Sequence, residues 1–351
     1  PMNEILKRLL PATLALVLLA GCGGNAAVSQ STSQSQSSSA SQSGSQGDQS
    51  LGSDEEAFLD EVALGEDVNL EDEAVAMTAA PAVSTMLTPV ASGTQVKKNN
   101  KAEIDYSNTK DGYVMVRFVA ATDKRLKVQV KGPTTTYTYN LTQGQSWTTF
   151  PLSDGNGTYK VVVYENTSGT KYATVLSQEM SVTLTDEFAP FLRPNQYVNY
   201  ENAPKTIAKA QELAGGTTDP LKKVELIYNY VVKNMTYDYK LASTVQSGYL
   251  PVLDTVLEKK TGICFDYAAL MTGMLRSQGV PCKLVVGYAG TAYHAWISVW
   301  SEGTGWVDGA IYFNGTSWQR MDPTFASTGK QSASIMQYIG DGKNYTVKYL
   351  Y

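Results

Sequence analysis

The charge distribution changes abruptly near residue 97 and limits which part of the chain can fold. Residues 23–96 contain eleven Asp or Glu residues and no Lys or Arg, and the stretch 29–50 is almost entirely Ser and Gln. A segment of this composition cannot bury enough apolar surface to offset its chain entropy, and its like charges favour an extended chain. We therefore expect residues 23–95 to form a disordered linker that tethers a folded part beginning near residue 96.

The first 22 residues have the features of an export signal, with translation expected to start at Met2. Lys7 and Arg8 precede an apolar run that ends in Leu19-Ala-Gly-Cys22. The run is too short to span a bilayer, and the final tetrad is similar to the lipobox of bacterial lipoproteins. We expect residues 1–22 to be a lipoprotein signal peptide, and lipid on Cys22 to anchor the exported protein to the outer face of a bacterial cell membrane. A plain secretion signal or a short membrane anchor is the alternative.

Residues 96–185 are rich in segments that favour β-structure. Runs of aromatic and β-branched residues lie at 113–119, 126–130, 136–141, 159–164 and 180–184. Short runs at this spacing predict a small all-β, immunoglobulin-like sandwich domain. The stretch Asp154-Gly-Asn-Gly157 lacks the further acidic residues of a calcium-binding loop, so we interpret it as a hairpin turn.

Cys264 lies where a helix is predicted to begin. It follows Gly262 and opens an apolar run with helical periodicity, which stops near Gly279. The unpaired backbone N–H groups in the first turn of a helix favour a thiolate there. Two further helices are predicted at 205–213 and 221–235.

His294 is the only histidine in the chain, so any imidazole chemistry must use it. It lies in a run of aromatic and β-branched residues that predicts a strand, with Trp296 and Ser298 on the same face. A carboxylate bonded to the second ring nitrogen would fix the tautomer and favour the imidazolium ion. Asp322 is the first candidate, because a strand that ends at a proline can present its last side chain at the end of a sheet.

Each of these residues also has a purely structural interpretation. Cys264 could be an inert buried thiol, His294 a structural histidine and Asp322 an ordinary turn aspartate. Asp308 is nearer to His294 in sequence and is a second candidate for the carboxylate. Cys282 is expected to pack as a small buried residue.

Together, these motifs resemble the transglutaminase-like superfamily, which has a papain-like core. The matching segments lie in the order of that family, at 262–268, 275–281, 285–288, 294–296 and 318–324. The resemblance implies an α+β fold, with a papain-like transglutaminase core at residues 186–351 preceded by the β-sandwich and the disordered tether. It also implies that Cys264 is the nucleophile, His294 the general base and acid, and Asp322 the orienting carboxylate.

This resemblance implies a cell-surface enzyme that forms a thioester on Cys264 from a peptide or glutamine amide. A peptidase or amidase is the preferred hypothesis, and a protein-cross-linking transglutaminase and a non-catalytic binding module are the alternatives. The expected partners are protein or peptide substrates, including cell-wall peptides, and the membrane through Cys22. We expect no cofactor and no nucleic acid, because the sequence has no phosphate-binding glycine motif and a single histidine disfavours a zinc site. The oligomeric state stays open.

Overall fold

The computed structural model describes residues 49–50, 86–289, 292–301, 305–308, 312–313, 318–319 and 345–351. The predicted signal peptide with Cys22, almost all of the predicted linker, and Asp322 lie outside these residues. The structural description below concerns the described residues only.

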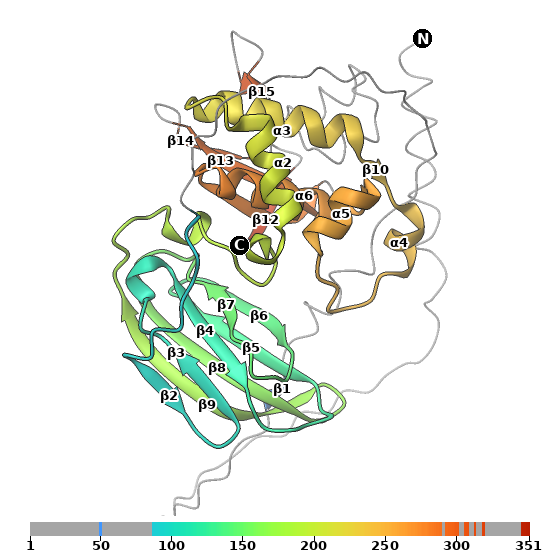
Figure 1. The fold of residues 1–351 in the computed structure, drawn as a ribbon. Coiled ribbons are helices and arrows are strands. Elements are labelled where there is room, and N and C mark those ends of the chain that lie inside the picture. The colour runs from blue at the N-terminus through green and yellow to red at the C-terminus, as the bar shows by residue number, and fades with distance from the viewer. Residues whose placement is uncertain are drawn as a thin grey trace, which may run out of the picture. The chain divides into compact units, whose positions relative to one another are not determined.

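The N-terminal half of the described chain forms two antiparallel sheets that face each other as a sandwich (Figure 1). One sheet has four strands in the order β2 (Val96–Lys98), β3 (Ala102–Asp105), β4 (Tyr113–Phe118) and β7 (Thr148–Pro151). The other has five, in the order β1 (Gln49–Ser50), β9 (Lys171–Val182), β8 (Gly157–Ser168), β5 (Leu126–Lys131) and β6 (Thr136–Leu141). The all-β sandwich expected from the sequence is confirmed.

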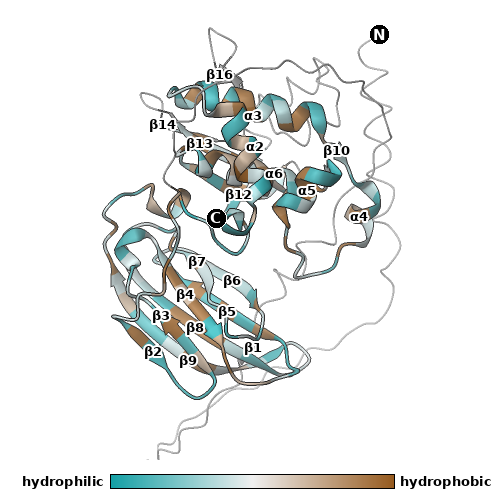
Figure 2. Ribbon diagram, in the orientation of Figure 1, coloured by the Kyte–Doolittle hydropathy of each residue, from teal (hydrophilic) through white to brown (hydrophobic). Residues whose placement is uncertain are grey.

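Strand β5 illustrates how side-chain alternation builds this sandwich. Leu126, Val128 and Val130 belong to the main hydrophobic core. Lys127 and Gln129 alternate with them and therefore point to the opposite face of the sheet. The brown and teal bands of Figure 2 follow the same alternation along the strands.

The turn at Asp154 is not the hairpin turn expected from the sequence. It connects β7 to β8, which belong to different sheets. The Asp154 carboxylate accepts hydrogen bonds from the backbone N–H and hydroxyl of Thr134, both at 2.6 Å, and from the N–H of Thr135 at 2.9 Å. Asp154 therefore ties the crossover between the sheets to the turn of the β5–β6 hairpin.

The C-terminal half combines helices with a second antiparallel sheet (Figure 1). The helices are η3 (Ala189–Phe191), η4 (Tyr200–Asn202), α2 (Pro204–Ala214), α3 (Pro220–Asn234), α4 (Tyr239–Thr244), α5 (Leu253–Lys259) and α6 (Cys264–Ser277). The sheet has the order β14 (Gly305–Asp308), β13 (Ala292–Ser301), β12 (Cys282–Ala289) and β17 (Tyr345–Leu350). Two pairs of short strands complete this half, β10 (Thr236–Tyr237) with β11 (Thr261–Gly262), and β15 (Tyr312–Phe313) with β16 (Trp318–Gln319).

The two helices predicted around 205–213 and 221–235 are confirmed as α2 and α3. None of the helices in the described part of the chain is long and apolar enough to cross a membrane.

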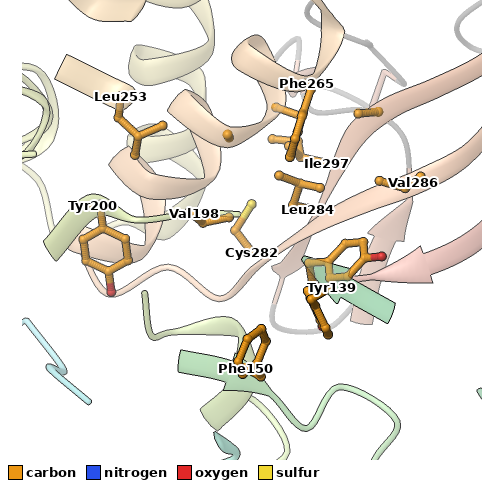
Figure 3. Packing of buried hydrophobic residues seen from close by; sticks show 14 of the residues in the cluster. Tyr139, Phe150, Val198, Tyr200, Leu253, Phe265, Cys282, Leu284, Val286 and Ile297 are labelled. Carbon is orange, nitrogen blue, oxygen red and sulfur yellow. The ribbon is translucent and has the colours of Figure 1, made fainter. Parts of the chain in front are cut away.

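Helix α6 is the centre of the C-terminal half, and all 14 of its residues are buried. It contacts α2, α3 and α5 as well as strands β12 and β13. Figure 3 shows Phe265 of this helix in the same packed cluster as Leu284 and Ile297 of the sheet. Gly273 permits the close approach of α5, since a Cβ atom there would lie 2.8 Å from Cδ1 of Leu253.

The first turn of α6 is stabilised by Asp266. Its Oδ2 accepts a hydrogen bond from the backbone N–H of Ile263 at 2.8 Å, and its Oδ1 accepts one from the Tyr249 hydroxyl at 2.7 Å. Gly262 is required beside it, because a Cβ atom at this position would lie 2.5 Å from Cβ of Asp266. Burial raises the pKa of Asp266 to about 6, against the lowering effect of both hydrogen bonds.

The last turn of α6 carries a buried arginine. The Arg276 guanidinium donates to the backbone carbonyls of Arg193 at 2.7 Å, Cys282 at 2.9 Å and Tyr351 at 2.6 Å. Burial lowers its pKa to about 10, so the group stays charged at neutral pH. One side chain therefore joins the end of α6 to three separate segments.

The raised pKa of Asp266 predicts a pH-dependent contribution to folding. The folded state favours the protonated Asp266 carboxyl. The contribution of this group to the free energy of unfolding is therefore complete below the usual carboxyl pKa of about 4, and it is lost as the pH rises through about 6. We expect this loss to be about 3 kcal/mol in the wild type and absent in Asp266→Asn. Denaturant unfolding at pH 4 and pH 7.5 measures this loss of unfolding free energy.

The control is Asp219→Asn, which alters an exposed N-cap of α3. An unchanged pH dependence in Asp266→Asn would contradict the prediction.

Candidate active site

Cys264 is the first residue of α6, as the sequence predicted. Its side chain is a free thiol and only 5% exposed. The N–H groups of the first helical turn lie beside it, and they favour negative charge on the sulfur. The fold thus places a free thiol at the start of a buried helix.

His294 lies on β13, directly opposite Gly287 of β12. Its side chain is 7% exposed, and its ring stacks on Trp296 with the ring centroids 6.3 Å apart and the planes at 23°. The two rings share one face of the strand, as the alternation predicted. Strand β13 packs against α6, the helix that begins at Cys264.

A cleft with a cavity volume of about 50 Å³ lies beside the starts of α6 and β13, and neither Cys264 nor His294 is among its described lining residues. Its lining includes Phe265, the residue after Cys264, and Tyr293, the residue before His294. Tyr249, which holds the start of α6 through Asp266, lines it too. Because Tyr293 and His294 are consecutive residues of β13, their side chains point to opposite faces of the strand, and the cleft lies on the face of Tyr293.

The structure describes less of the two candidates for the orienting carboxylate, Asp322 and Asp308. Asp322 lies outside the described residues. The backbone of Asp308 lies in β14 opposite Ser298, four residues beyond His294 along β13. The assignment of the orienting carboxylate therefore stays a prediction from the sequence.

Tyr237 is a further residue of the site, and the sequence analysis did not single it out. It pairs with Gly262 across the parallel strands β10 and β11, and its hydroxyl is hydrogen-bonded to the backbone of Cys264. Burial first, and then the negative charge of a Cys264 thiolate, raise the pKa of Tyr237 well above its usual value. The hydroxyl consequently stays protonated beside the sulfur. In the sequence, the only indication of Tyr237 is its position just after α3.

Cys282 has none of these features. It is fully buried at the start of β12, and its thiol contacts the Thr272 hydroxyl at 3.5 Å. Burial raises the pKa of Cys282 to about 11. The expectation of a packed, buried cysteine is confirmed, and both Cys264 and Cys282 are free thiols.

No group of three or more His, Cys, Asp or Glu side chains in the described part of the chain is arranged to hold a metal ion.

The chain is similar to several known proteins. A protein-glutamine gamma-glutamyltransferase of Pseudomonas aeruginosa is 28% identical over 119 residues, which cover 30% of this chain and 17% of that protein. An uncharacterized protein of Haemophilus influenzae is 32% identical over 76 residues, which cover 22% of this chain and 20% of that protein. The match thus spans about a fifth of the length of these curated relatives.

Among solved structures, the periplasmic domain of TgpA from Pseudomonas aeruginosa aligns with 71% of this chain and 79% of its own length, with 19% sequence identity and a TM-score of 0.30. Residues 207–323 match the model of the transglutaminase-like superfamily. This segment includes Cys264, His294 and Asp322, and its helix-and-strand architecture is the α+β fold described above. Within residues 207–323, the chain is therefore similar to the transglutaminase-like superfamily.

Proposed function

We propose that the protein is a thiol acyl-transfer enzyme that acts on peptide or glutamine amides through a thioester on Cys264, with hydrolysis as its main outcome. The observation that carries this proposal is a free cysteine at the start of the buried helix α6, in a segment that matches the transglutaminase-like superfamily and also contains the only histidine. The name of the Pseudomonas aeruginosa relative supports a glutamine amide as one acyl donor.

In the proposed first step, the Cys264 thiolate forms a bond to the amide carbonyl carbon. The C–N bond then breaks, and the nitrogen leaves as an amine or ammonia after taking a proton from the His294 imidazolium. In the second step, water or an amine attacks the thioester and gives a proton to His294. The C–S bond breaks, and the thiolate is regenerated. Asp322 holds the ring in the tautomer that both steps need.

The tetrahedral intermediate of each step carries a negative oxygen that needs hydrogen-bond donors. The backbone N–H of Cys264 is one donor.

Cross-linking is the second candidate reaction. A transferase must keep water away from the thioester while an amine approaches. The sequence has no long insertion between Tyr288 and His294 that could supply a lid. The short connection supports hydrolysis over transfer.

The proposal places this enzyme outside the cell. Its support is the Leu19-Ala-Gly-Cys22 pattern, with the acidic Ser- and Gln-rich segment as a spacer between the lipid and the folded part. Protein surfaces and cell-wall peptides are then within reach as substrates.

The nucleophile assignment is tested by comparing the two cysteines. Iodoacetamide should alkylate Cys264 much faster than Cys282, because Cys264 lies at a helix start, whereas Cys282 is fully buried and burial raises its pKa to about 11. Cys264→Ala should lower turnover by at least about 1,000-fold, and Cys282→Ala should lower it less than about 2-fold. Peptide mass mapping and amide-hydrolysis assays measure both effects. Faster labelling of Cys282 would refute the assignment.

The carboxylate assignment is tested with two asparagine variants. Asp322→Asn should lower turnover by roughly 100-fold or more with the fold kept, because an amide favours the wrong tautomer and cannot offset the imidazolium charge. Asp308→Asn should have a small effect. Kinetics with circular dichroism as the folding control measure the ranking, and the reverse ranking would transfer the role to Asp308.

The acyl acceptor is tested by product partition. With a glutamine-containing peptide and a millimolar lysine analogue, we expect more glutamate product than isopeptide product, measured by mass spectrometry. Isopeptide in excess would make the protein a transglutaminase in the strict sense.

A further inference from the structure

The five-stranded sheet of the sandwich has a second buried cluster, which lies on its outer face. Val162, Tyr164 and Tyr172 are each no more than 3% exposed, and they form a group separate from the main hydrophobic core. The two members on β8 alternate with the core residues Val161 and Val163, so they point away from the other sheet. We call these three residues the outer cluster.

The main packing partners of β8 and β9 among the described elements do not cover the outer cluster. These partners are the neighbouring strands β1 and β5 and the facing strands β2 and β3. The facing strands belong to the opposite sheet and pack against the inner face. The cover of the outer face therefore comes from outside these elements.

Basic side chains surround the outer cluster. The Arg125 guanidinium and the Lys127 ammonium each lie 5.8 Å from the ring centroid of Tyr172. Lys127 is only 8% exposed, and none of the ion pairs among the described residues involves it. Lys131 and Lys160 are opposite each other in the register of β5 and β8 and extend the basic surface. Because a buried ammonium favours a carboxylate partner, this face suits a segment that is both acidic and apolar.

The chain contains a segment of this composition close to the outer face. Strand β1 pairs Gln49 with Tyr172 at the edge of the sheet, so the chain leaves β1 beside the outer cluster. Residues 54–64 follow, and they combine five acidic residues with Phe58 and Leu59 and contain no Lys or Arg. Adjacent strands lie about 4.8 Å apart and an extended residue spans about 3.3 Å, so this segment can reach across β9 and β8 to β5.

The chain is fixed to the sandwich again where the described residues resume. Met86 packs against the hydrophobic core, and the backbone N–H of Val90 donates to the Tyr113 hydroxyl of β4 at 3.0 Å. The stretch between Ser50 and Met86 therefore begins and ends on the same domain. Anchoring at both ends lowers the entropy cost of a contact between this stretch and the sheet.

We propose that residues 54–64 dock on the outer face of the five-stranded sheet. Phe58 and Leu59 cover the outer cluster. The carboxylates on either side of them pair with Arg125 and Lys127. The contact confines the free part of the proposed spacer to the Ser- and Gln-rich stretch, so that stretch alone sets how far the folded part reaches from the lipid.

Hydrogen–deuterium exchange with mass spectrometry tests this docking in the full chain. At low salt, we expect the amides of residues 54–64 to exchange at least about tenfold more slowly than those of an unstructured chain. High salt should raise their exchange rate, because salt screens the ion pairs. Residues 29–46 are the internal control, since they lack large apolar side chains and should exchange freely at either salt concentration.

Variants of the segment separate the apolar contacts from the charged ones. Phe58→Ser should remove the protection of residues 54–64. The pair Glu55→Gln and Glu56→Gln should weaken the protection and its salt dependence. The pair Glu71→Gln and Glu73→Gln is the matched control, because it makes the same change of charge outside the segment. An equal effect of the two pairs would reject the ion pairs.

Oxidative footprinting of Tyr164 and Tyr172 reports on the face itself. Hydroxyl radicals should oxidise both rings slowly in the wild type and faster in Phe58→Ser, with circular dichroism as the control for folding. Free exchange of residues 54–64 in the wild type, or equal protection in Phe58→Ser, would overturn the proposal. Slow oxidation of the rings together with free exchange of the segment would also overturn it and would show a different cover. Loss of that cover on dilution would assign it to a second copy of the chain.

Discussion

Helix α6 is buried along its whole length, so the polar groups at both of its ends must find partners inside the protein. Asp266 supplies an acceptor at the first turn, and Arg276 finds three acceptors at the last. The rest of the C-terminal half is arranged around this requirement. The position of Cys264 is a consequence of it, because the same first turn that Asp266 stabilises carries the thiol.

Much of this architecture could be predicted from the sequence because it depends on local patterns. Alternation placed His294 and Trp296 on one face of a strand, and helical periodicity after Gly262 placed Cys264 at a helix start. Both features arise within a few consecutive residues. The ordered motifs between 262 and 324 then indicated the superfamily, since they combine several such local features.

Other parts of the site depend on contacts between distant segments and could not be predicted. Tyr237 lies beside the start of α6 only because β10 pairs with β11. The turn at Asp154 was misassigned for the same reason. Its sequence suits a hairpin, but the strands on either side belong to different sheets.

The bonds of Arg276 have a consequence for the order in which the chain folds. The carbonyl of Tyr351 lies 75 residues beyond Arg276 in the sequence, and β17 forms the edge of the sheet beside β12. During synthesis, helix α6 emerges long before β17 and Tyr351, so the Arg276 guanidinium lacks one of its three acceptors until this last segment arrives. A nascent chain can therefore hold its thiol on a formed helix without a completed sheet beneath it. Assembly of the site is consequently coupled to the arrival of a strand that contributes none of its reacting groups.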